Sequence, residues 1–172
     1  MSTTNTNLEL WLIRHGETEW SASGKHTSRS DVLLTARGQR SAQAIGRYLA
    51  GRQFSMVLTS PRQRAQETCN IAGYSMRAVI DENLAEWDYG NYEGRTTAEI
   101  RSEQADWSIW SAPVPGGESI ERVAKRAESV IDRAEKSLER PLTRSSMDIS
   151  PWTRGSCPQP TCWRASLVKQ RK

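Results

Sequence analysis

At 172 residues the chain fits one domain, which would bury roughly two thirds of the surface that its unfolded chain exposes. It contains no apolar stretch of about 18 residues and no basic-then-apolar leader, so we expect neither membrane insertion nor secretion and predict a cytoplasmic protein. Three cysteines, an odd number without a framework of spacings, argue against a disulfide-built fold.

The net charge of +4 belongs to the C-terminal tail. Residues 1–140 hold 18 Lys or Arg and 19 Asp or Glu, whereas residues 141–172 hold 6 Lys or Arg and one acid, Asp148. Basic residues that bind nucleic acid usually lie on a folded element with aromatic neighbours, but here they are scattered among Pro and Ser. We therefore expect no nucleic-acid partner.

The first predicted element is a strand over residues 8–13, an apolar run with the composition of a strand buried on both faces. Residues 1–7 before it are polar and are expected to be disordered. Arg14, His15 and Gly16 follow where the strand would end. Ligands of open α/β sheets bind at the carboxyl ends of the strands, and a guanidinium with an imidazole at this edge suits a phosphate.

Residues 16–34 are rich in Ser, Gly and Thr and predict a long loop that could wrap a ligand. Thr35 can cap a helix that runs to about Ala50. The apolar residues on one face of this helix are Ala42, Ile45, Tyr48 and Leu49. A second buried strand is predicted over residues 54–58, and Pro61 marks the start of the next helix.

A third strand is predicted over residues 76–80, followed by a shaped loop over residues 81–95 and a short helix over residues 96–104. The clearest helix begins near Ser119, because apolar residues repeat there at steps of three and four. Strands that alternate with helices predict an α/β fold with three layers, α/β/α, around a mostly parallel central sheet.

The pattern ends at Arg140. Residues 141–172 hold four prolines, five serines and no glutamate, which predicts neither a buried strand nor a long helix. The sequence therefore divides into a disordered N-terminus (1–7), one α/β domain (8–140) and an atypical basic, Pro/Ser-rich tail (141–172) that is either disordered or the product of a shifted reading frame.

Three motifs resemble those of the histidine phosphatase superfamily, which is phosphoglycerate mutase-like in fold. They are Arg-His-Gly-Glu-Thr at 14–18, Ser-Pro-Arg-Gln-Arg-Ala-Gln-Glu-Thr at 60–68 and Leu-Ala-Glu-Trp-Asp-Tyr-Gly-Asn-Tyr-Glu-Gly at 84–94. The motifs occur in the family's order within about residues 8–140. The compact third motif looks most like that of the acid phosphatases and sugar-bisphosphatases.

The resemblance implies that His15 is the nucleophile and forms a phosphohistidine, which water later cleaves. A histidine with an ordinary pKa near about 6.5 is already neutral at pH 7, as this role requires. Glu86 matches the general acid, and apolar Leu84, Ala85 and Trp87 around it would disfavour its charged form.

Arg14 and Arg62 supply forked donors that can each hold two phosphate oxygens. Ser21 and Thr27 fall where the family uses small polar residues on phosphate or substrate. Arg37 and Arg64 lack the motif context that supports a role for Arg62, so we expect them to be surface charges.

The leading functional prediction is hydrolysis of a small phosphorylated metabolite without a metal or organic cofactor. A mutase that transfers a phosphoryl group is the alternative enzyme, but only 22 residues separate Gly94 from Gly117, which leaves little room for a mutase-like insertion. A catalytically silent phosphate-binding protein or defective copy is the other alternative. Cys157 and Cys162 could form half a zinc site, but the only histidines, His15 and His26, are assigned elsewhere.

The resemblance stops where the family has a further strand beside the first one, which delivers a second histidine to the pocket. No histidine follows His26 in this chain. By analogy with removing one preorganised donor, its loss would cost about 100- to 1,000-fold in rate. We hypothesise that residues from about 141 onward are a shifted reading frame or a divergent replacement. Resequencing the coding DNA would refute a shift if the frame were intact and related proteins shared the tail.

Overall fold

The computed structural model describes residues 9–139 and 167–170. The strands are β1 (Glu9–Leu12), β2 (Phe54–Thr59), β3 (Ala78–Ile80) and β4 (Leu167–Gln170). The helices are α1 (Glu19–Ala22), α2 (Ala36–Leu49), α3 (Gln63–Ile71), α4 (Thr97–Glu103) and α5 (Ile120–Glu139). Three short 3₁₀ helices are η1 (Ser75–Arg77), η2 (Glu82–Leu84) and η3 (Gly90–Tyr92). The predictions for residues 1–7 and for residues 141–166 lie outside the described residues.

The strands form one sheet in the order β1-β4-β2-β3. β2 and β3 are parallel, whereas β4 is antiparallel to both of its neighbours, β1 and β2. β1, β2 and β3 therefore run in one direction, as the alternation of strands and helices predicts. Consequently the chain leaves β1 and β2 at the same edge of the sheet.

The sequence predicts no strand beyond Arg140, and β4 corrects this expectation. Leu167 pairs with Leu12 and Gln170 with Glu9, so β4 lies beside the first strand. The four residues of β4 follow Pro160, the last proline of the chain, so every one of them retains the N–H that a ladder needs. Local composition averaged over the whole tail hides this short segment.

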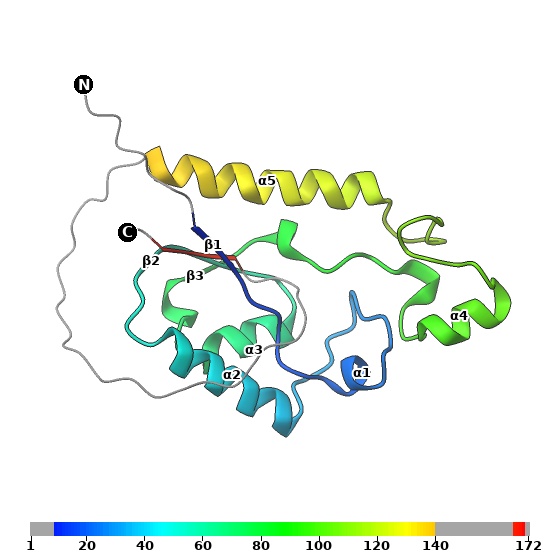
Figure 1. Ribbon diagram of the computed structural model, residues 1–172, viewed down its shortest axis with the longest axis horizontal. Coiled ribbons are helices and arrows are strands. Elements are labelled where there is room, and N and C mark those ends of the chain that lie inside the picture. Colours follow the sequence, from blue (N-terminus) through cyan, green and yellow to red (C-terminus); the bar gives the residue numbers. More distant parts are fainter. Residues whose placement is uncertain (1–8, 140–166, 171–172) are drawn as a thin grey trace.

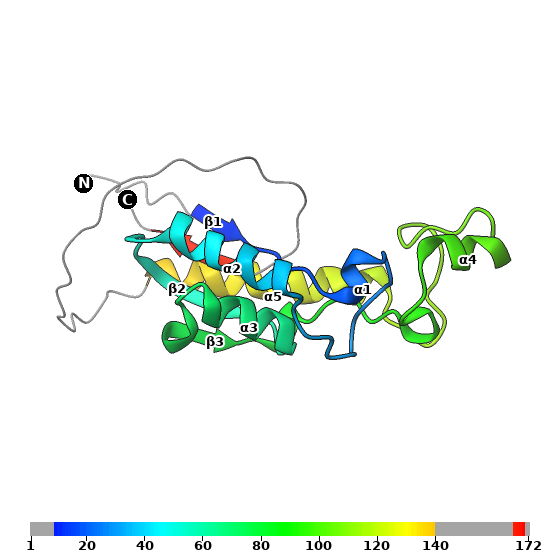
Figure 2. The ribbon, with the colours of Figure 1, turned by 90° about the horizontal axis from the view of Figure 1, so that it is seen from below.

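The predicted three-layer α/β/α architecture is confirmed. α5 covers one face of the sheet, and α2 with α3 covers the other (Figure 1, Figure 2). On the α5 side, Val130 and Ala134 pack against Leu58 of β2. On the opposite side, Leu49 of α2 joins Phe54 and Val57 in a second buried cluster. The sheet is thus held by apolar side chains on both faces.

The first strand is less buried than the sequence predicts. None of its four residues is buried, and Leu12 is 43% exposed. On the facing helix, Ile120 and Ile131 are 41% and 42% exposed. The apolar faces of β1 and α5 are therefore only partly covered within the described part of the chain.

Capping contacts start α2 and α4, and the cap of α2 is the predicted residue Thr35. The Thr35 hydroxyl accepts from the Gly38 N–H at 3.0 Å and caps α2, and Thr96 with Glu99 forms a capping box that starts α4. Two local differences occur. α1 lies inside the predicted loop, and η1 replaces the first residues of the predicted third strand, so β3 begins only at Ala78.

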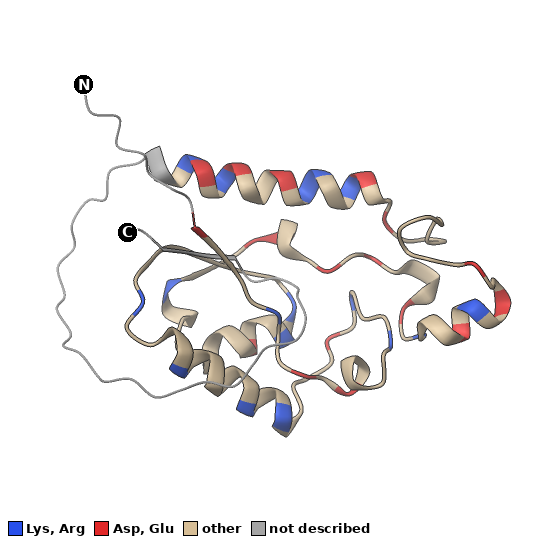
Figure 3. Ribbon diagram, viewed as in Figure 1, with Lys and Arg blue, Asp and Glu red and all other residues tan. Residues whose placement is uncertain are grey.

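A separate aromatic cluster holds the segment between β3 and α5. Trp87, Tyr92 and Trp107 are buried there together with Ile100. Figure 2 shows that α4 lies at the far end of the molecule from the sheet. Figure 3 shows acidic and basic residues interspersed along α5, whereas the charged residues of α2 are all basic. No helix among the described residues is long and apolar enough to cross a bilayer.

Candidate active site

The predicted site residues come from segments that leave the sheet at one edge. Arg14 and His15 follow β1, Arg62 follows β2, and Glu86 follows η2. Arg62 is the N-cap residue of α3, so it stands at the turn from the second strand into that helix. The chain direction of β1 and β2 thus brings distant parts of the sequence to one place.

The backbone at Gly16 passes very close to the first turn of α2. A Cβ atom at Gly16 would lie 2.4 Å from the Gly38 carbonyl oxygen, and one at Gly38 would lie 2.2 Å from the Glu17 carbonyl oxygen. Only glycine fits at both positions. The Gly16 N–H also donates to the buried Thr68 hydroxyl of α3 at 2.9 Å, which ties the end of β1 to the second motif.

The His15 ring is half-buried, and its Nδ1 lies 2.7 Å from the carbonyl oxygen of Gly16. This contact is a hydrogen bond when Nδ1 carries the proton, which leaves the lone pair on Nε2. Burial lowers the pKa of His15, and the charges of Arg64 and Arg14 lower it further, against the opposing effects of the Gly16 carbonyl and Glu86. The geometry therefore favours a neutral imidazole with a free Nε2.

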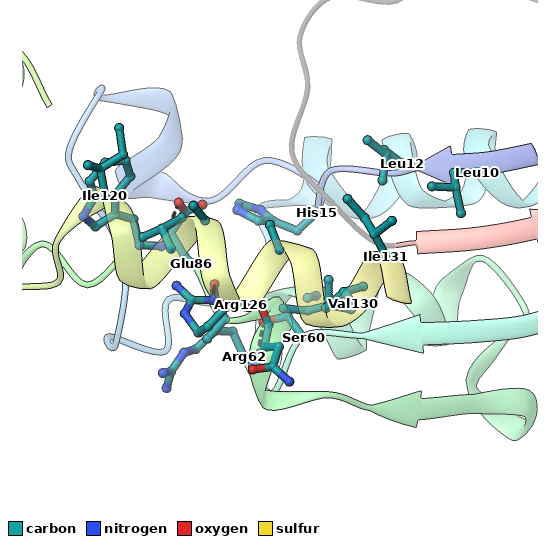
Figure 4. A pocket seen from close by; sticks show the side chains of 18 of the residues that line it. Leu10, Leu12, His15, Ser60, Arg62, Glu86, Ile120, Arg126, Val130 and Ile131 are labelled. Carbon is teal, nitrogen blue, oxygen red and sulfur yellow. Dashed lines mark hydrogen bonds between the residues drawn. The ribbon is translucent and has the colours of Figure 1, made fainter. Parts of the chain in front are cut away.

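His15 and Glu86 both line a central cavity of about 500 Å³ between the sheet and α5. Figure 4 shows that its polar side chains gather at one end, while Leu10, Leu12 and Ile131 line the other. The polar lining residues include His15, Ser60, Arg62, Arg64, Glu86 and Arg126. One Glu86 oxygen accepts from the backbone N–H of Trp87 at 3.0 Å, which orients the carboxylate.

Arg64 corrects the sequence analysis, which treats it as a surface charge. It is 1% exposed and lines the central cavity together with His15 and Arg62. Its charge acts on His15 more strongly than that of Arg14. Arg37, the other arginine expected at the surface, is indeed exposed and pairs with Glu17 at 3.4 Å. Position on α3 explains the difference, since the side of α3 that bears Ala65 and Thr68 faces the interior.

Arg64 also shapes the first loop. Its guanidinium donates to the carbonyl oxygens of Ser30 and Thr27, both at 3.0 Å, and its Nε is buried without a hydrogen-bond partner in the described structure. Glu93 closes the same loop from the other side, because its carboxylate accepts from the N–H groups of Ser28 and Ser30. Burial would raise the pKa of Glu93, but the donors on Ser28 and Ser30 outweigh it and lower the pKa.

Ser21 and Thr27 line a second pocket, of about 180 Å³, which also contains Arg14, His15 and Glu86. The hydroxyl of Ser21 donates to the Thr18 carbonyl at 3.0 Å, and that of Thr27 to the Lys25 carbonyl at 3.2 Å. The sequence analysis misses His26 in this pocket. Its ring lies 4.6 Å from that of Tyr89, and burial lowers its pKa against the charges of Glu86 and Glu93.

The segment that carries Glu86 is held by Arg126 of α5. Arg126 grips the Glu118 carboxylate with two hydrogen bonds, at 2.7 and 2.6 Å, and donates to the carbonyl oxygens of Asn83 and Ala85. This bidentate pair fixes the backbone directly before Glu86. The regular apolar period of α5 reveals the helix but not this polar contact.

Within the described ranges, no group of three or more His, Cys, Asp or Glu residues is arranged to hold a metal ion. Cys157 and Cys162 lie outside those ranges. The described residues that line the two cavities supply the imidazoles of His15 and His26, several guanidinium groups and the carboxyl group of Glu86.

Comparison with known proteins identifies the family of the chain. The family model of the histidine phosphatase superfamily (branch 1) matches residues 10–141. The chain is 40% identical over 146 residues to an acid phosphatase of Mycobacterium tuberculosis, an alignment that covers 84% of this chain and 70% of that protein. It is 32% identical over 145 residues to sedoheptulose 1,7-bisphosphatase of Saccharomyces cerevisiae, covering 71% of this chain and 54% of that protein.

A solved structure of an open reading frame product from Mycobacterium tuberculosis superposes with a TM-score of 0.68 at 41% identity, covering 74% of this chain and 66% of that one. In these comparisons the chain thus spans between 54% and 70% of the length of its relatives.

Proposed function

The chain belongs to the histidine phosphatase superfamily, and from this premise we propose that it hydrolyses phosphate monoesters of small metabolites through a phosphohistidine on His15. The observation that carries the proposal is the shared cavity, in which a half-buried imidazole with a free Nε2 lies among Arg62, Arg64 and Glu86. The names of the relatives, an acid phosphatase and a sugar bisphosphatase, support phosphoryl chemistry.

In the first step, Nε2 of His15 attacks the phosphorus atom and the bond to the alcohol oxygen breaks. The Nδ1 contact with the Gly16 carbonyl keeps the proton away from the attacking nitrogen. Arg14 and Arg62 hold the non-bridging oxygens of the phosphoryl group, and Arg64 joins them as a third guanidinium beside His15. Preorganised cations of this kind stabilise the charge that builds up in the transition state.

Glu86 gives its proton to the departing alcohol oxygen, so the product leaves as a neutral alcohol. In the second step the same carboxylate takes a proton from water, which attacks the phosphohistidine and releases inorganic phosphate. Ser21 and Thr27 line the wall where the phosphate or substrate is held. The reaction needs no metal and no organic cofactor.

Hydrolysis is favoured over transfer to a second substrate because the segment between η3 and α5 is short. It contains only the seven-residue helix α4 and loops that pack into the aromatic cluster around Trp107. This leaves no described domain that would enclose a substrate and exclude water.

The test is hydrolysis of para-nitrophenyl phosphate by the purified chain, with and without a chelator, beside His15→Ala and His26→Ala. We expect metal-independent release of nitrophenol that falls at least 1,000-fold in His15→Ala, because the nucleophile is lost. The family's second pocket histidine would follow position 26, where this chain has no histidine. We therefore expect the wild-type rate to lie about 100- to 1,000-fold below that of a relative that has this histidine.

His26→Ala is the comparison variant: it removes the other imidazole of the chain, which lines the smaller pocket, while the nucleophile remains, so it should lose much less activity than His15→Ala. Trapping of a radiolabelled phosphoenzyme gives a second readout. Activity that survives His15→Ala, or that the chelator abolishes, would contradict the proposed mechanism. A chain that binds inorganic phosphate but turns over no ester would favour a silent phosphate-binding protein.

A further inference from the structure

We propose that Arg126 of α5 is a positioning residue for the reaction: together with Glu118 it holds the backbone on both sides of Glu86 and so places the carboxyl group that protonates the leaving oxygen. This inference rests on the proposed function, because it concerns the role that Glu86 has there. Arg126 and Glu86 both lie at the polar end of the central cavity (Figure 4). Arg126 belongs to none of the three sequence motifs.

The segment that carries Glu86 lies between two short 3₁₀ helices. η2 ends at Leu84 and η3 begins at Gly90, so Glu86 belongs to neither a helix nor a strand. A catalytic group must keep its place to within about 0.5 Å for efficient proton transfer. The position of Glu86 therefore depends on contacts with neighbouring elements.

Arg126 supplies such contacts on the N-terminal side of Glu86. Its Nη1 donates to the carbonyl oxygens of Asn83 and Ala85, at 2.8 and 2.9 Å. Its Nε and Nη2 donate to the two carboxylate oxygens of Glu118, at 2.7 and 2.6 Å. These four hydrogen bonds use four of the five N–H groups of a guanidinium, so at most one remains for a substrate. Arg126 therefore acts on the reaction through the protein rather than by holding a phosphate.

Glu118 supplies the contacts on the C-terminal side of Glu86. Its carbonyl oxygen accepts from the indole N–H of Trp87 at 2.8 Å, and its own N–H donates to the Asp88 carbonyl oxygen at 3.0 Å. A Cβ atom at Gly117 would lie 2.4 Å from the same Asp88 carbonyl oxygen, so the two segments are in direct contact. The Glu118 backbone thus holds the two residues that follow Glu86.

The ion pair between Arg126 and Glu118 joins these two sets of contacts. The side chains are 21% and 9% exposed, so water screens their attraction only weakly. The hydrogen bond from Arg126 lowers the pKa of Glu118 against the effect of burial. The hydrogen bond to Glu118 raises the pKa of Arg126, also against burial, and the charges of Glu118 and Glu86 raise it further. Both partners are therefore charged at neutral pH, and a bidentate pair fixes direction as well as distance.

A displaced proton donor slows the release of some leaving groups more than others. Nitrophenolate is stable as an anion at neutral pH, so hydrolysis of para-nitrophenyl phosphate needs little proton donation. Phenol, like a tyrosine side chain, has a pKa near about 10, so hydrolysis of phenyl phosphate depends on the proton from Glu86. The ratio of kcat/KM for phenyl phosphate to that for para-nitrophenyl phosphate therefore measures proton donation. Loss of folded protein lowers both values equally and leaves this ratio unchanged.

The experiment measures the ratio for wild type, Glu86→Gln, Arg126→Gln and Arg133→Gln. Arg133 is the matched control, because it is another arginine of α5 that pairs with a carboxylate, that of Asp81 at 2.7 Å, but lines none of the cavities described above. We expect Arg126→Gln to lower the ratio about tenfold, in the same direction as Glu86→Gln, whereas Arg133→Gln should keep it within about twofold of wild type.

A second variant covers the case in which Arg126→Gln does not fold, as judged by circular dichroism. Arg126→Lys keeps the positive charge but lacks the fork that reaches a carboxylate and two carbonyl groups at once, so the same fall in the ratio is expected. An unchanged ratio in a folded Arg126 variant, or an equal fall in Arg133→Gln, overturns the inference. Failure of both Arg126 variants to fold also overturns it, because the residue then serves folding rather than proton donation.

The same assays separate this inference from the proposed function. If Glu86→Gln leaves the ratio unchanged, or if wild type hydrolyses neither ester, the proposed function fails and the inference fails with it. If Glu86→Gln lowers the ratio and the folded Arg126 variant does not, the proposed function stands and only the inference fails.

Discussion

At the scale of single residues, burial distinguishes side chains that look alike in the sequence. Arg37 and Arg64 are each the second residue of a helix near a motif, but the Arg37 side chain is 76% exposed whereas Arg64 is 1% exposed. The carbonyl groups of the first loop accept hydrogen bonds from both terminal nitrogens of the Arg64 guanidinium. A charge in this position can act on the neighbouring imidazole because little water screens it.

We expect Arg64→Met to lower the free energy of unfolding by about 2–4 kcal/mol, since the substitution leaves the carbonyl oxygens of the first loop without their donor. Arg37→Met should change it by less than about 0.5 kcal/mol, because exposed ion pairs contribute little. Urea unfolding of both variants at pH 7 checks the prediction. Equal changes in the free energy of unfolding would mean that the buried contacts of Arg64 contribute no more stability than the exposed side chain of Arg37.

The lowered pKa of His15 predicts the acid side of the activity profile. Burial lowers this pKa, as do the Arg64 and Arg14 charges, so the imidazole stays neutral to a lower pH than an ordinary histidine. The reaction needs the neutral ring, and activity should therefore fall only when the pH drops below about 6.5. The measurement is kcat/KM for para-nitrophenyl phosphate between pH 4 and 8. An acid midpoint above 6.5 would contradict it.

At the scale of elements, the site depends on how closely α2 approaches the end of β1. Gly16 and Gly38 bring the two backbones into contact, and Thr68 of α3 fixes the same point from the other side. The first loop is then closed by Arg64 and Glu93, residues of α3 and of the segment after η3. Three separate elements thus hold the imidazole and the loop that surrounds it.

Gly38→Ala tests this contact. Alanine is more favourable than glycine inside a helix by about 1 kcal/mol, so helix propensity alone predicts that the variant is more stable. We expect the opposite, a loss of about 2 kcal/mol or more together with reduced activity, because the new Cβ would lie 2.2 Å from the Glu17 carbonyl oxygen.

Ser41→Ala, at an exposed position of the same helix, is the control and should leave both quantities close to wild type. Thermal unfolding and nitrophenol release measure the two effects. A Gly38→Ala protein that is more stable than wild type would show that the close approach of α2 to β1 is unimportant.

At the scale of the whole molecule, the α/β/α layers are asymmetric. The side of α2 and α3 is closed by Leu49, Phe54 and Val57. On the α5 side a cavity of about 500 Å³ remains, with Leu12 and Ile131 partly exposed. Apolar surface of this kind lowers stability and promotes association, because its contact with water is unfavourable.

Ala127→Leu should stabilise the protein by about 1 kcal/mol, since Ala127 lines this cavity and a larger apolar side chain would fill part of it. Lys125→Leu is the control, because it adds a leucine at an exposed position of α5 that lines no described cavity. Thermal unfolding with binding of an apolar dye provides the measurement. If the Ala127→Leu variant has a melting temperature no higher than that of Lys125→Leu, the prediction that a larger side chain fills this cavity is wrong.

The sequence alone determines the family resemblance, the α-helices other than α1 and the strands other than β4. Periodicity and capping residues are local signals, so α2 and α5 are found close to their predicted bounds. The three motifs place His15, Arg14, Arg62 and Glu86 at one edge of the sheet, where the structure has them around shared cavities. Their catalytic roles stay predictions.

Only the tertiary structure decides which polar residues support the site. Arg64 donates a hydrogen bond to the Ser28 carbonyl, 36 positions away in the sequence, and Glu93 accepts one from the Ser28 N–H, 65 positions away. Similarly, β4 pairs with β1, although almost the whole length of the chain separates these two strands in the sequence. Contacts between distant residues depend on how the layers pack, and neither periodicity nor capping encodes that packing, because both act over only a few neighbouring residues.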